Sequence, residues 1–225
     1  MANTWLVVFI AVFGAPIDAL TSEVSRLYDR KTYDALYKGV KSMDRGHLNP
    51  FAINSFSRDY AKSTFVYTNA VPQYSQWNRG AWKEYEKSIR RYTQLTCGCE
   101  HRGTMYLITG TSDINIKLIL GREKFEIKSQ RSPNKFIYSG ALRAGIDIPN
   151  SLWTAGCCVW KDEFNNLMAQ SIAVIGNNTP DPLQHNTTGM TLKDLEQLLG
   201  NKVDLFPKVP ACRATSLKLR VKYVL

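Results

Sequence analysis

One long amphipathic segment among several short apolar runs most constrains the fold of this chain. Residues 78–95 (NRGAWKEYEKSIRRYTQL) place Ala81, Tyr85, Ile89 and Tyr92 at three- and four-residue steps. That spacing puts apolar side chains on one face of an α-helix. The segment therefore predicts a helix that packs one side against a core.

Short apolar runs predict strands around this helix. A second helix is expected at 191–200, where Thr191 and Asp194 form a capping pattern and Gly200 marks the end. Runs rich in β-branched and aromatic residues predict strands at 64–71, 104–110, 114–120, 135–141, 152–160 and 168–176. Many strands with few helices predict an α+β fold around a mostly antiparallel sheet.

The N-terminus carries an apolar run at residues 5–16. It has the length of a signal-peptide core and is too short to span a bilayer. We expect a signal peptide over residues 1–19 and a single domain over 20–225, in a secreted protein. The alternative is that the run forms the first strand or helix of the folded domain. No later stretch reaches transmembrane length, so no membrane span is expected.

Cysteine usage also favours secretion. An oxidising compartment would pair most of the cysteines and leave one thiol free or bonded to another chain, because their number is odd. A zinc site of the type C-x-C-x-H at 97–101 is the less favoured alternative, since its spacing is unusual. Two sequons, at Asn177 and Asn186, would carry glycans on an exported chain. The five cysteines are Cys97, Cys99, Cys157, Cys158 and Cys212.

The charge of the chain is unusually basic. Twenty-nine Lys and Arg residues stand against 19 Asp and Glu residues, a formal net charge of +10. Such a surface favours polyanionic partners, namely nucleic acid, heparin-like glycans or anionic membrane.

A cluster of polar residue types lies at KSMDRGHLNP (41–50), where a turn brings an imidazole, a guanidinium and a carboxylate together. The predicted helix adds four more polar residues. At 100° per residue, Asn78, Glu86 and Arg90 lie within about 120° of one another, with Arg79 among them. One edge of the buried face thus carries an amide, a carboxylate and two guanidiniums. Capping by Asn78 and an exposed Glu86–Arg90 ion pair are the ordinary alternatives.

These residues resemble the DNA/RNA non-specific endonuclease family of ββα-metal nucleases. The resemblance rests on D-R-G-H at 44–47, N-x-x-P-Q at 69–73 and N-x-G-x-W at 78–82. A glutamate, Glu86, follows Asn78 by eight residues (86 − 78 = 8). The C-terminal part is more loosely similar to the animal, extracellular branch of the family.

The resemblance implies a metal-dependent endonuclease that cleaves DNA and/or RNA without sequence preference. His47 would be the general base, Asn78 the ligand of a Mg²⁺ ion, and Glu86 the residue that holds metal-bound waters. Mn²⁺ could substitute for Mg²⁺. The resemblance further implies phosphate binding by Arg45, Arg79 and Arg90, support of the site by Asn69, and orientation of the turn by Asp44.

Two other functions stay open at this point. A catalytically weak or inactive nuclease fold could bind nucleic acid or other polyanions, although the presence of His47 and Asn78 favours catalysis. A mitochondrial enzyme is the second alternative, with residues 1–20 as an anchor or import segment. Trp77 and Trp82 could stack on bases, while core packing is expected for Trp82. The sequence does not predict the oligomeric state.

Overall fold

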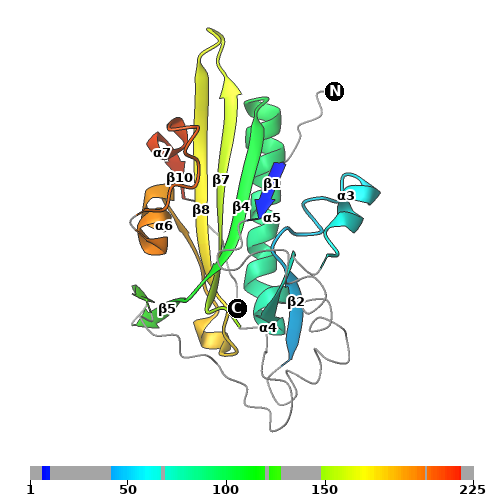
Figure 1. Ribbon diagram of the computed structural model, residues 1–225, viewed down its shortest axis with the longest axis vertical. Helices are drawn as coiled ribbons and strands as arrows, with labels where there is room; N and C mark the ends of the chain where they lie inside the picture. The colour runs from blue at the N-terminus through cyan, green and yellow to red at the C-terminus, as the bar shows by residue number, and fades with distance from the viewer. Residues whose placement is uncertain are drawn as a thin grey trace.

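A computed structural model describes residues 7–10, 42–66, 69–119, 122–127, 148–200 and 202–218 (Figure 1). Within these residues, six strands form the main sheet. Its central pairs, β4–β7, β7–β8 and β8–β9, are antiparallel, whereas β1 and β10 run parallel to β4 and β8. The predicted α+β fold with a mostly antiparallel sheet is confirmed. The strands are β1 (Val7–Ile10), β4 (Thr104–Ser112), β7 (Ser151–Lys161), β8 (Leu167–Asn177), β9 (Thr187–Met190) and β10 (Ser216–Leu217).

Two antiparallel pairs lie outside the main sheet. β2 (Met43–His47) pairs with β3 (Ala70–Tyr74), with Asp44 opposite Gln73 and His47 opposite Ala70. β5 (Ile114–Ile119) pairs with β6 (Arg122–Ile127). The first pair leads directly into the long helix, which gives a β–β–α unit.

The long helix begins earlier and ends later than the sequence predicts. Four consecutive segments run without a break: α4 (Ser75–Trp77), the wider turns of η3 (Asn78–Trp82), α5 (Lys83–Tyr92) and η4 (Thr93–Glu100). Gly80 bends the helix, with φ −105° and ψ −108°. The interpretation of Asn78 as an N-cap is wrong, because Asn78 has helical angles (φ −57°, ψ −46°) one turn inside the helix.

The predicted strand at 64–71 is wrong at residues 64–66, which form no strand. They follow the short helix α3 (Arg58–Ser63), and the Thr64 side chain donates to the Ala61 carbonyl at its end. The strand starts only at Ala70. β-branched and aromatic residues favour strands only where a neighbouring strand and a core receive them. Here Phe65 and Val66 are exposed and have no such neighbours among the described residues.

The remaining elements lie in the C-terminal half. The predicted helix at 191–200 is confirmed as α6 (Leu192–Leu199), with a reciprocal capping box between Thr191 and Asp194. Gly200 follows it at φ +136°, a conformation that favours glycine. η5 (Pro182–Gln184) and α7 (Ala211–Ala214) are short. The strands predicted at 104–110, 114–120, 152–160 and 168–176 correspond to β4, β5, β7 and β8, and the one at 135–141 lies outside the described residues.

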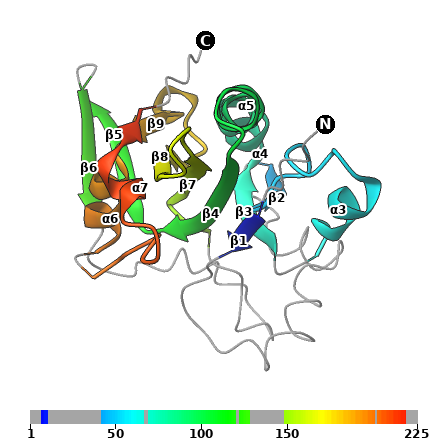
Figure 2. The same cartoon turned by 90° about the horizontal axis from the view of Figure 1, so that it is seen from above.

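The core has two parts, one on each face of the main sheet. The long helix covers one face, and α6 and α7 lie on the other (Figure 2). Neighbouring residues of β7 point to opposite faces, so Cys157 and Cys158 enter different parts of the core. Cys158 is bonded to Cys97 of η4, and Cys157 to Cys212 of α7. Two disulfides and one free, exposed thiol, Cys99, agree with the expected pairing of most cysteines.

The two sequons have different surroundings. Asn177 is 6% exposed, and its Nδ2 donates to the carbonyls of Ile116 and Gln184. Asn186 is half-buried, and its Nδ2 donates to the Thr188 hydroxyl two residues on. The atom that would carry a glycan is therefore enclosed at Asn177.

β1 belongs to the segment for which a signal peptide is expected, and Val7–Ile10 pairs with β4. Among the described residues, no helix has the length and apolar character needed to cross a membrane.

Candidate active site

The Asp44 carboxylate joins the D-R-G-H strand to the long helix. It accepts hydrogen bonds from Ser75 Oγ at 2.8 Å and from Asn78 Nδ2 at 2.9 Å. Arg79 adds a two-point contact through Nε at 2.9 Å and Nη2 at 2.7 Å. Partial burial opposes ionisation, but the hydrogen bonds from Arg79, Asn78 and Ser75 together hold the pKa of Asp44 below its usual value. Asp44 is therefore an ionised acceptor at neutral pH.

This contact orients the Asn78 amide. An ionised carboxylate only accepts hydrogen bonds, so the NH₂ group of Asn78 has to face Asp44. The amide oxygen Oδ1 is then the atom of Asn78 that can face a cation. Asn78 itself is half-buried at the second turn of the helix.

Gly46 of D-R-G-H and Gln73 of N-x-x-P-Q are packed directly together. A Cβ at Gly46 would lie 2.1 Å from Gln73 Cδ, so a larger residue would displace the glutamine. Gln73 is fully buried, and its Nε2 and Oε1 have no hydrogen-bond partner among the described residues. Two separate sequence motifs thus form one interlocked pair of strands.

Asn69 holds the backbone that follows His47 through four hydrogen bonds. Its Oδ1 accepts from the Asn49 N–H at 2.8 Å, and its Nδ2 donates to the carbonyls of Asn49 at 3.0 Å and Thr64 at 2.8 Å. Its own carbonyl accepts from the Leu48 N–H at 2.9 Å. Because Asn69 is only 1% exposed, these bonds fix the backbone just after His47.

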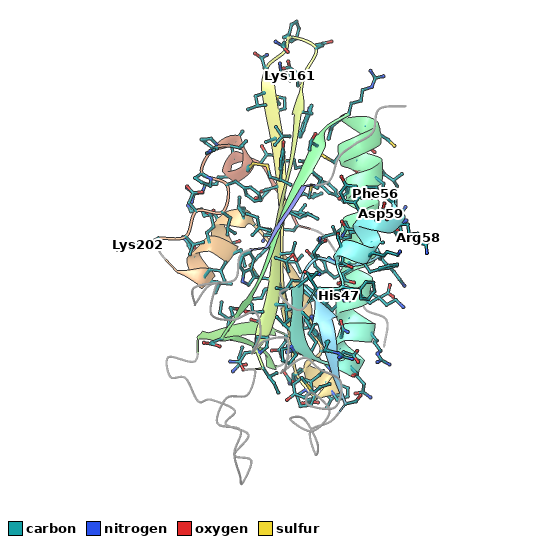
Figure 3. All side chains as sticks on the ribbon, turned by 45° about the vertical axis from the view of Figure 1, so that its right-hand side comes forward. His47, Phe56, Arg58, Asp59, Lys161 and Lys202 are labelled. Atoms are coloured by element: carbon teal, nitrogen blue, oxygen red, sulfur yellow. A yellow bond between two sulfur atoms is a disulfide. The ribbon has the colours of Figure 1, made fainter. Side chains whose placement is uncertain are left out.

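His47 lies at the end of β2 (Figure 3). Its ring contacts Phe65 edge to face, with 5.0 Å between centroids and 88° between planes. Burial lowers the pKa of His47, because desolvation disfavours the charged imidazolium. The imidazole is therefore neutral at neutral pH, the form that can accept a proton.

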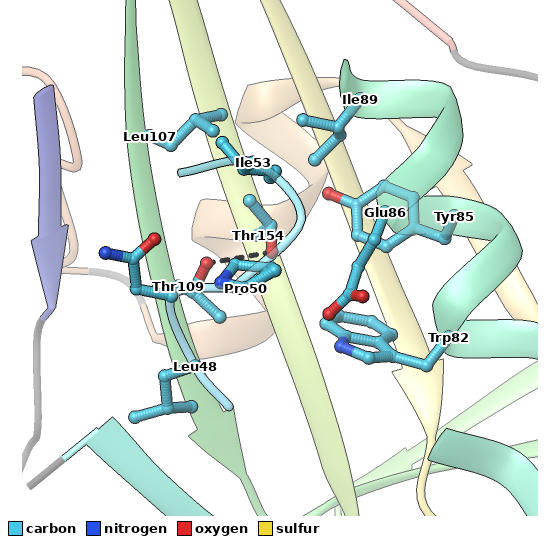
Figure 4. Close-up of a pocket in the computed structure, with 11 residues that line it drawn as sticks. Leu48, Pro50, Ile53, Trp82, Tyr85, Glu86, Ile89, Leu107, Thr109 and Thr154 are labelled. Atoms are coloured by element: carbon cyan, nitrogen blue, oxygen red, sulfur yellow. Dashed lines mark hydrogen bonds between the residues drawn. The ribbon is translucent and has the colours of Figure 1, made fainter. Parts of the chain in front are cut away.

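Glu86 points from α5 into a small pocket beside this turn (Figure 4). Leu48, Asn49 and Pro50, the residues that follow His47, line the pocket together with Trp82. Burial raises the pKa of Glu86 to about 8, and the nearby Lys83 ammonium offsets that rise only in part. The pocket therefore holds a carboxyl group that would gain from a nearby cation.

The three expected phosphate-binding residues differ in their surroundings. Arg45 on β2 and Arg90 on α5 are exposed, and Arg90 follows Glu86 by one helical turn. Arg79 is paired with Asp44, although its side chain is 73% exposed. Trp77 and Trp82 are 0% and 1% exposed, so neither can stack on a base. The suggestion of base stacking is wrong for Trp77, and the core packing expected for Trp82 is confirmed.

The candidate site has few of the side chains that most often bind metal ions in proteins. Among the described residues, no three His, Cys, Asp or Glu side chains gather in a metal-binding group. Cys97, part of the alternative zinc pattern, is bonded to Cys158. An amide oxygen with few protein ligands suits Mg²⁺, which keeps most of its waters.

Three features around the site were not predicted from the sequence: the Gly46–Gln73 packing, the hydrogen bonds of Asn69, and exposed aromatic side chains beside His47. The aromatic signal was present in the sequence. Four aromatic residues occur within the fifteen residues 51–65, directly after the D-R-G-H turn. Their exposure could not be read from the sequence, because the same residues also suit a strand.

Comparison with known proteins places these observations in a family. The description "DNA/RNA non-specific endonuclease" applies to the family that matches residues 21–211. No curated protein sequence matches the chain. A solved structure titled "Crystal structure of the EndoG/EndoGI complex: Mechanism of EndoG inhibition" is similar to it, with 17% identity and a TM-score of 0.44. The similarity covers 72% of this chain and only 59% of that one. Because the family match spans most of its length, the chain belongs to the DNA/RNA non-specific endonuclease family.

Proposed function

We propose that the protein is a metal-dependent endonuclease that hydrolyses phosphodiester bonds of DNA and/or RNA without strong sequence preference. The observation that carries the proposal is the Asp44 carboxylate, which links the D-R-G-H strand to the Asn78 amide. Family membership makes the link meaningful, since both ends belong to the motifs that resemble the family.

His47 is proposed as the general base. Its neutral imidazole would take a proton from the attacking water, and Phe65 and the strand end would hold the ring in place. The hydrogen bonds of Asn69 would act indirectly, by fixing the backbone that follows His47. Asn69 is thus a positioning residue in this proposal.

Asn78 is proposed as the protein ligand of Mg²⁺, with Mn²⁺ as a substitute. Two observations support the fit: the bond to Asp44 occupies Asn78 Nδ2 and leaves Oδ1 as the possible ligand atom, and Lys83 offsets the raised pKa of the Glu86 carboxyl only in part. When bound, the ion would neutralise the charge that develops on the phosphate. Glu86 would accept hydrogen bonds from water in the pocket.

Arg45 and Arg90 are proposed to bind phosphate oxygens, a task that suits the planar guanidinium. Arg79 was expected to join them. Its two-point contact with Asp44 supports a different role, in which it holds Asp44 against Asn78. Phosphate contacts carry no sequence information, so cleavage would tolerate many sequences.

We further propose that the protein belongs to the extracellular branch of the family, with residues 1–19 as signal peptide. Two disulfides support an oxidising compartment. The enclosed amide of Asn177 leaves Asn186 as the proposed glycan site. N-terminal sequencing and peptide mass spectrometry of the secreted protein test this. An intact Met1 without added glycan mass would contradict export.

Plasmid degradation by the purified protein tests the activity. We expect cleavage with Mg²⁺ and none in excess EDTA. Plasmid retention on the protein without cleavage under any metal condition would instead support a non-catalytic polyanion-binding protein.

A further inference from the structure

Residues 51–66 form an arm that stands beside His47, and we call this segment the aromatic arm. It contains α3, which lies at the outer edge of the molecule (Figure 2). The segment is held at its base by the buried side chains of Ile53 and Ala61 and by Asn54, whose Nδ2 donates to Asn49 and Pro50. Asn69 ties its two ends together. The aromatic arm is therefore a built feature of the fold.

Its large side chains face outward. Phe56 and Phe65 are 57% and 67% exposed, and Phe51 and Tyr60 are 46% and 48% exposed. They form two ring pairs, Phe51–Phe65 with 5.6 Å and Phe56–Tyr60 with 5.2 Å between centroids. Gathered exposed aromatics of this kind mark an interaction surface more often than chance.

The aromatic arm is continuous with the candidate active site. Phe65 contacts the His47 ring directly and Phe51 at the same time. In the view of Figure 3, Phe56 and Arg58 lie on the same side of the molecule as His47. A ligand that reaches His47 would therefore meet Phe65 first among these rings.

The charges on the aromatic arm suit an anionic ligand. Arg58 and Lys62 are exposed on α3, and Asp59 is the opposing acidic residue between them. The whole chain carries a formal net charge of +10. Exposed rings that alternate with basic side chains are the pattern by which proteins bind single-stranded nucleic acid.

We propose that the aromatic arm is a stacking platform for unpaired bases, which makes single-stranded nucleic acid the preferred substrate of the active site. The proposal rests on the endonuclease function proposed above. In a duplex the faces of the bases are already stacked, so a base can reach the rings only after it has been unstacked, which has a free-energy cost. A free strand can instead place its bases on the rings and its phosphates near Arg58 and Lys62.

Binding measured without cleavage tests the proposal. Fluorescence anisotropy of the full-length protein in EDTA gives the Kd for a labelled oligothymidylate and for a duplex of the same length. We expect Phe56→Ser/Tyr60→Ser to raise the Kd for the single strand by at least about ten-fold, as the loss of one stacked base would. The Kd for the duplex should change by less than about two-fold, because its bases do not use the rings.

Matched variants separate stacking from other effects. Phe164→Ser/Leu167→Ser removes two exposed apolar side chains (77% and 57%) from the β7–β8 hairpin and should change neither Kd. Phe56→Leu/Tyr60→Leu keeps apolar bulk and should lose single-strand affinity as the serine variant does. Neither substitution changes charge, so the slope of log Kd against log salt should stay constant in both.

Three results would overturn the proposal. The first is an equal loss of affinity for single strand and duplex, and the second is no loss for either. The third is a loss of binding to anionic vesicles with unchanged binding to the oligothymidylate, which would assign the aromatic arm to a membrane surface. Because the assay needs no catalysis, failure of plasmid cleavage with Mg²⁺ would count against the endonuclease function and not against the aromatic arm.

Discussion

At the scale of the single residue, the Asp44 carboxylate accepts hydrogen bonds from three side chains at the start of the long helix. From the sequence, Asp44 is expected only to orient the turn. The structure adds that it selects the orientation of the Asn78 amide. The proposed metal ligand therefore depends on a residue that would not touch the metal.

Replacing Asp44 by asparagine tests that dependence. Asp44→Asn lets the new amide act as a donor as well as an acceptor, so the Asn78 amide is no longer held with Nδ2 toward residue 44. We expect the affinity for Mn²⁺, measured by titration calorimetry, to fall about 10- to 100-fold. Arg79→Gln separates the two effects: it removes one support of Asp44 while Ser75 and Asn78 still donate to the carboxylate, so it should cost less affinity than Asp44→Asn. An equal loss in Arg79→Gln would show that the ion pair, and not the amide orientation, controls the site.

The raised pKa of Glu86 predicts that the stability of the metal-free protein depends on pH. Burial raises its pKa from 4.5 to about 8, so between these values the folded chain holds a proton that the unfolded chain has released. The free energy of unfolding therefore falls as pH rises through this window. The lowered pKa of His47 acts oppositely and removes stability as pH falls below 6.5.

Thermal melts in EDTA across this window measure the effect. Glu86→Gln should flatten the decline on the alkaline side, because the amide does not titrate. Glu84→Gln, at an exposed position of the same helix, should leave the decline unchanged. Identical pH profiles for wild type and Glu86→Gln would contradict the buried, protonated carboxyl.

At the scale of the element, the sequence predicted the long helix, α6 and the strands β4, β5, β7 and β8, because their periodicity reflects which face is buried. It missed α3 and β2, and it failed at residues 64–66, where β-propensity is satisfied by no sheet. The turn there is fixed by hydrogen bonds of Asn69 to Thr64 and, twenty residues away, to Asn49, and no local pattern reveals the bonds to Asn49. The N-cap interpretation of Asn78 failed because the helix begins at Ser75, directly after β3, and Asn78 therefore lies inside it.

In the candidate site, too, some features could be predicted from the sequence and others could not. Motif spacing found the residues, because a strand, a strand and a helix in sequence order form one local unit. Spacing could not reveal that Asp44 holds Asn78, that Gly46 packs on Gln73, or that Phe65 covers one edge of His47. These contacts depend on side-chain orientation in the folded unit.

The hydrogen bonds of Asn69 give a prediction at this scale. Asn69→Ala leaves the Asn49 N–H and two carbonyls without these partners, and each unsatisfied group costs about 1–3 kcal/mol. We expect a marked fall in the free energy of unfolding and faster proteolysis within the aromatic arm. Asn166→Ala, which removes the exposed side-chain hydrogen bond from Asn166 Nδ2 to Asp162 at the β7–β8 hairpin, is the control and should cost less than about 1 kcal/mol. Unchanged proteolysis in Asn69→Ala would show that the arm is closed by other contacts.

At the scale of the whole molecule, two disulfides fasten the layers on both faces of the sheet to adjacent residues of β7. Cys97 lies on the long helix and Cys212 on α7, so each bond links a different layer to the central strand. The site on the β–β–α unit therefore depends on a scaffold that is cross-linked through its centre.

Removing one disulfide tests this arrangement. Cys157→Ala/Cys212→Ala opens a link between residues 55 apart, which should lower the free energy of unfolding by about 4 kcal/mol. Denaturant unfolding monitored by tryptophan fluorescence measures the loss. Cys99→Ser removes the free, exposed thiol and should have no effect. A wild-type melting temperature that does not change on reduction would contradict the role of the disulfides.

The rate of plasmid cleavage as a function of Mn²⁺ concentration tests the central claim most directly, for wild type, His47→Ala and Asn78→Ala. We predict no wild-type cleavage in EDTA. His47→Ala should lower kcat by about 10²- to 10⁴-fold without shifting the half-maximal Mn²⁺ concentration, because the imidazole acts on water. Asn78→Ala should shift that concentration upward and recover part of its rate at saturation. Full wild-type activity in excess EDTA, or wild-type rates in His47→Ala, would contradict the account.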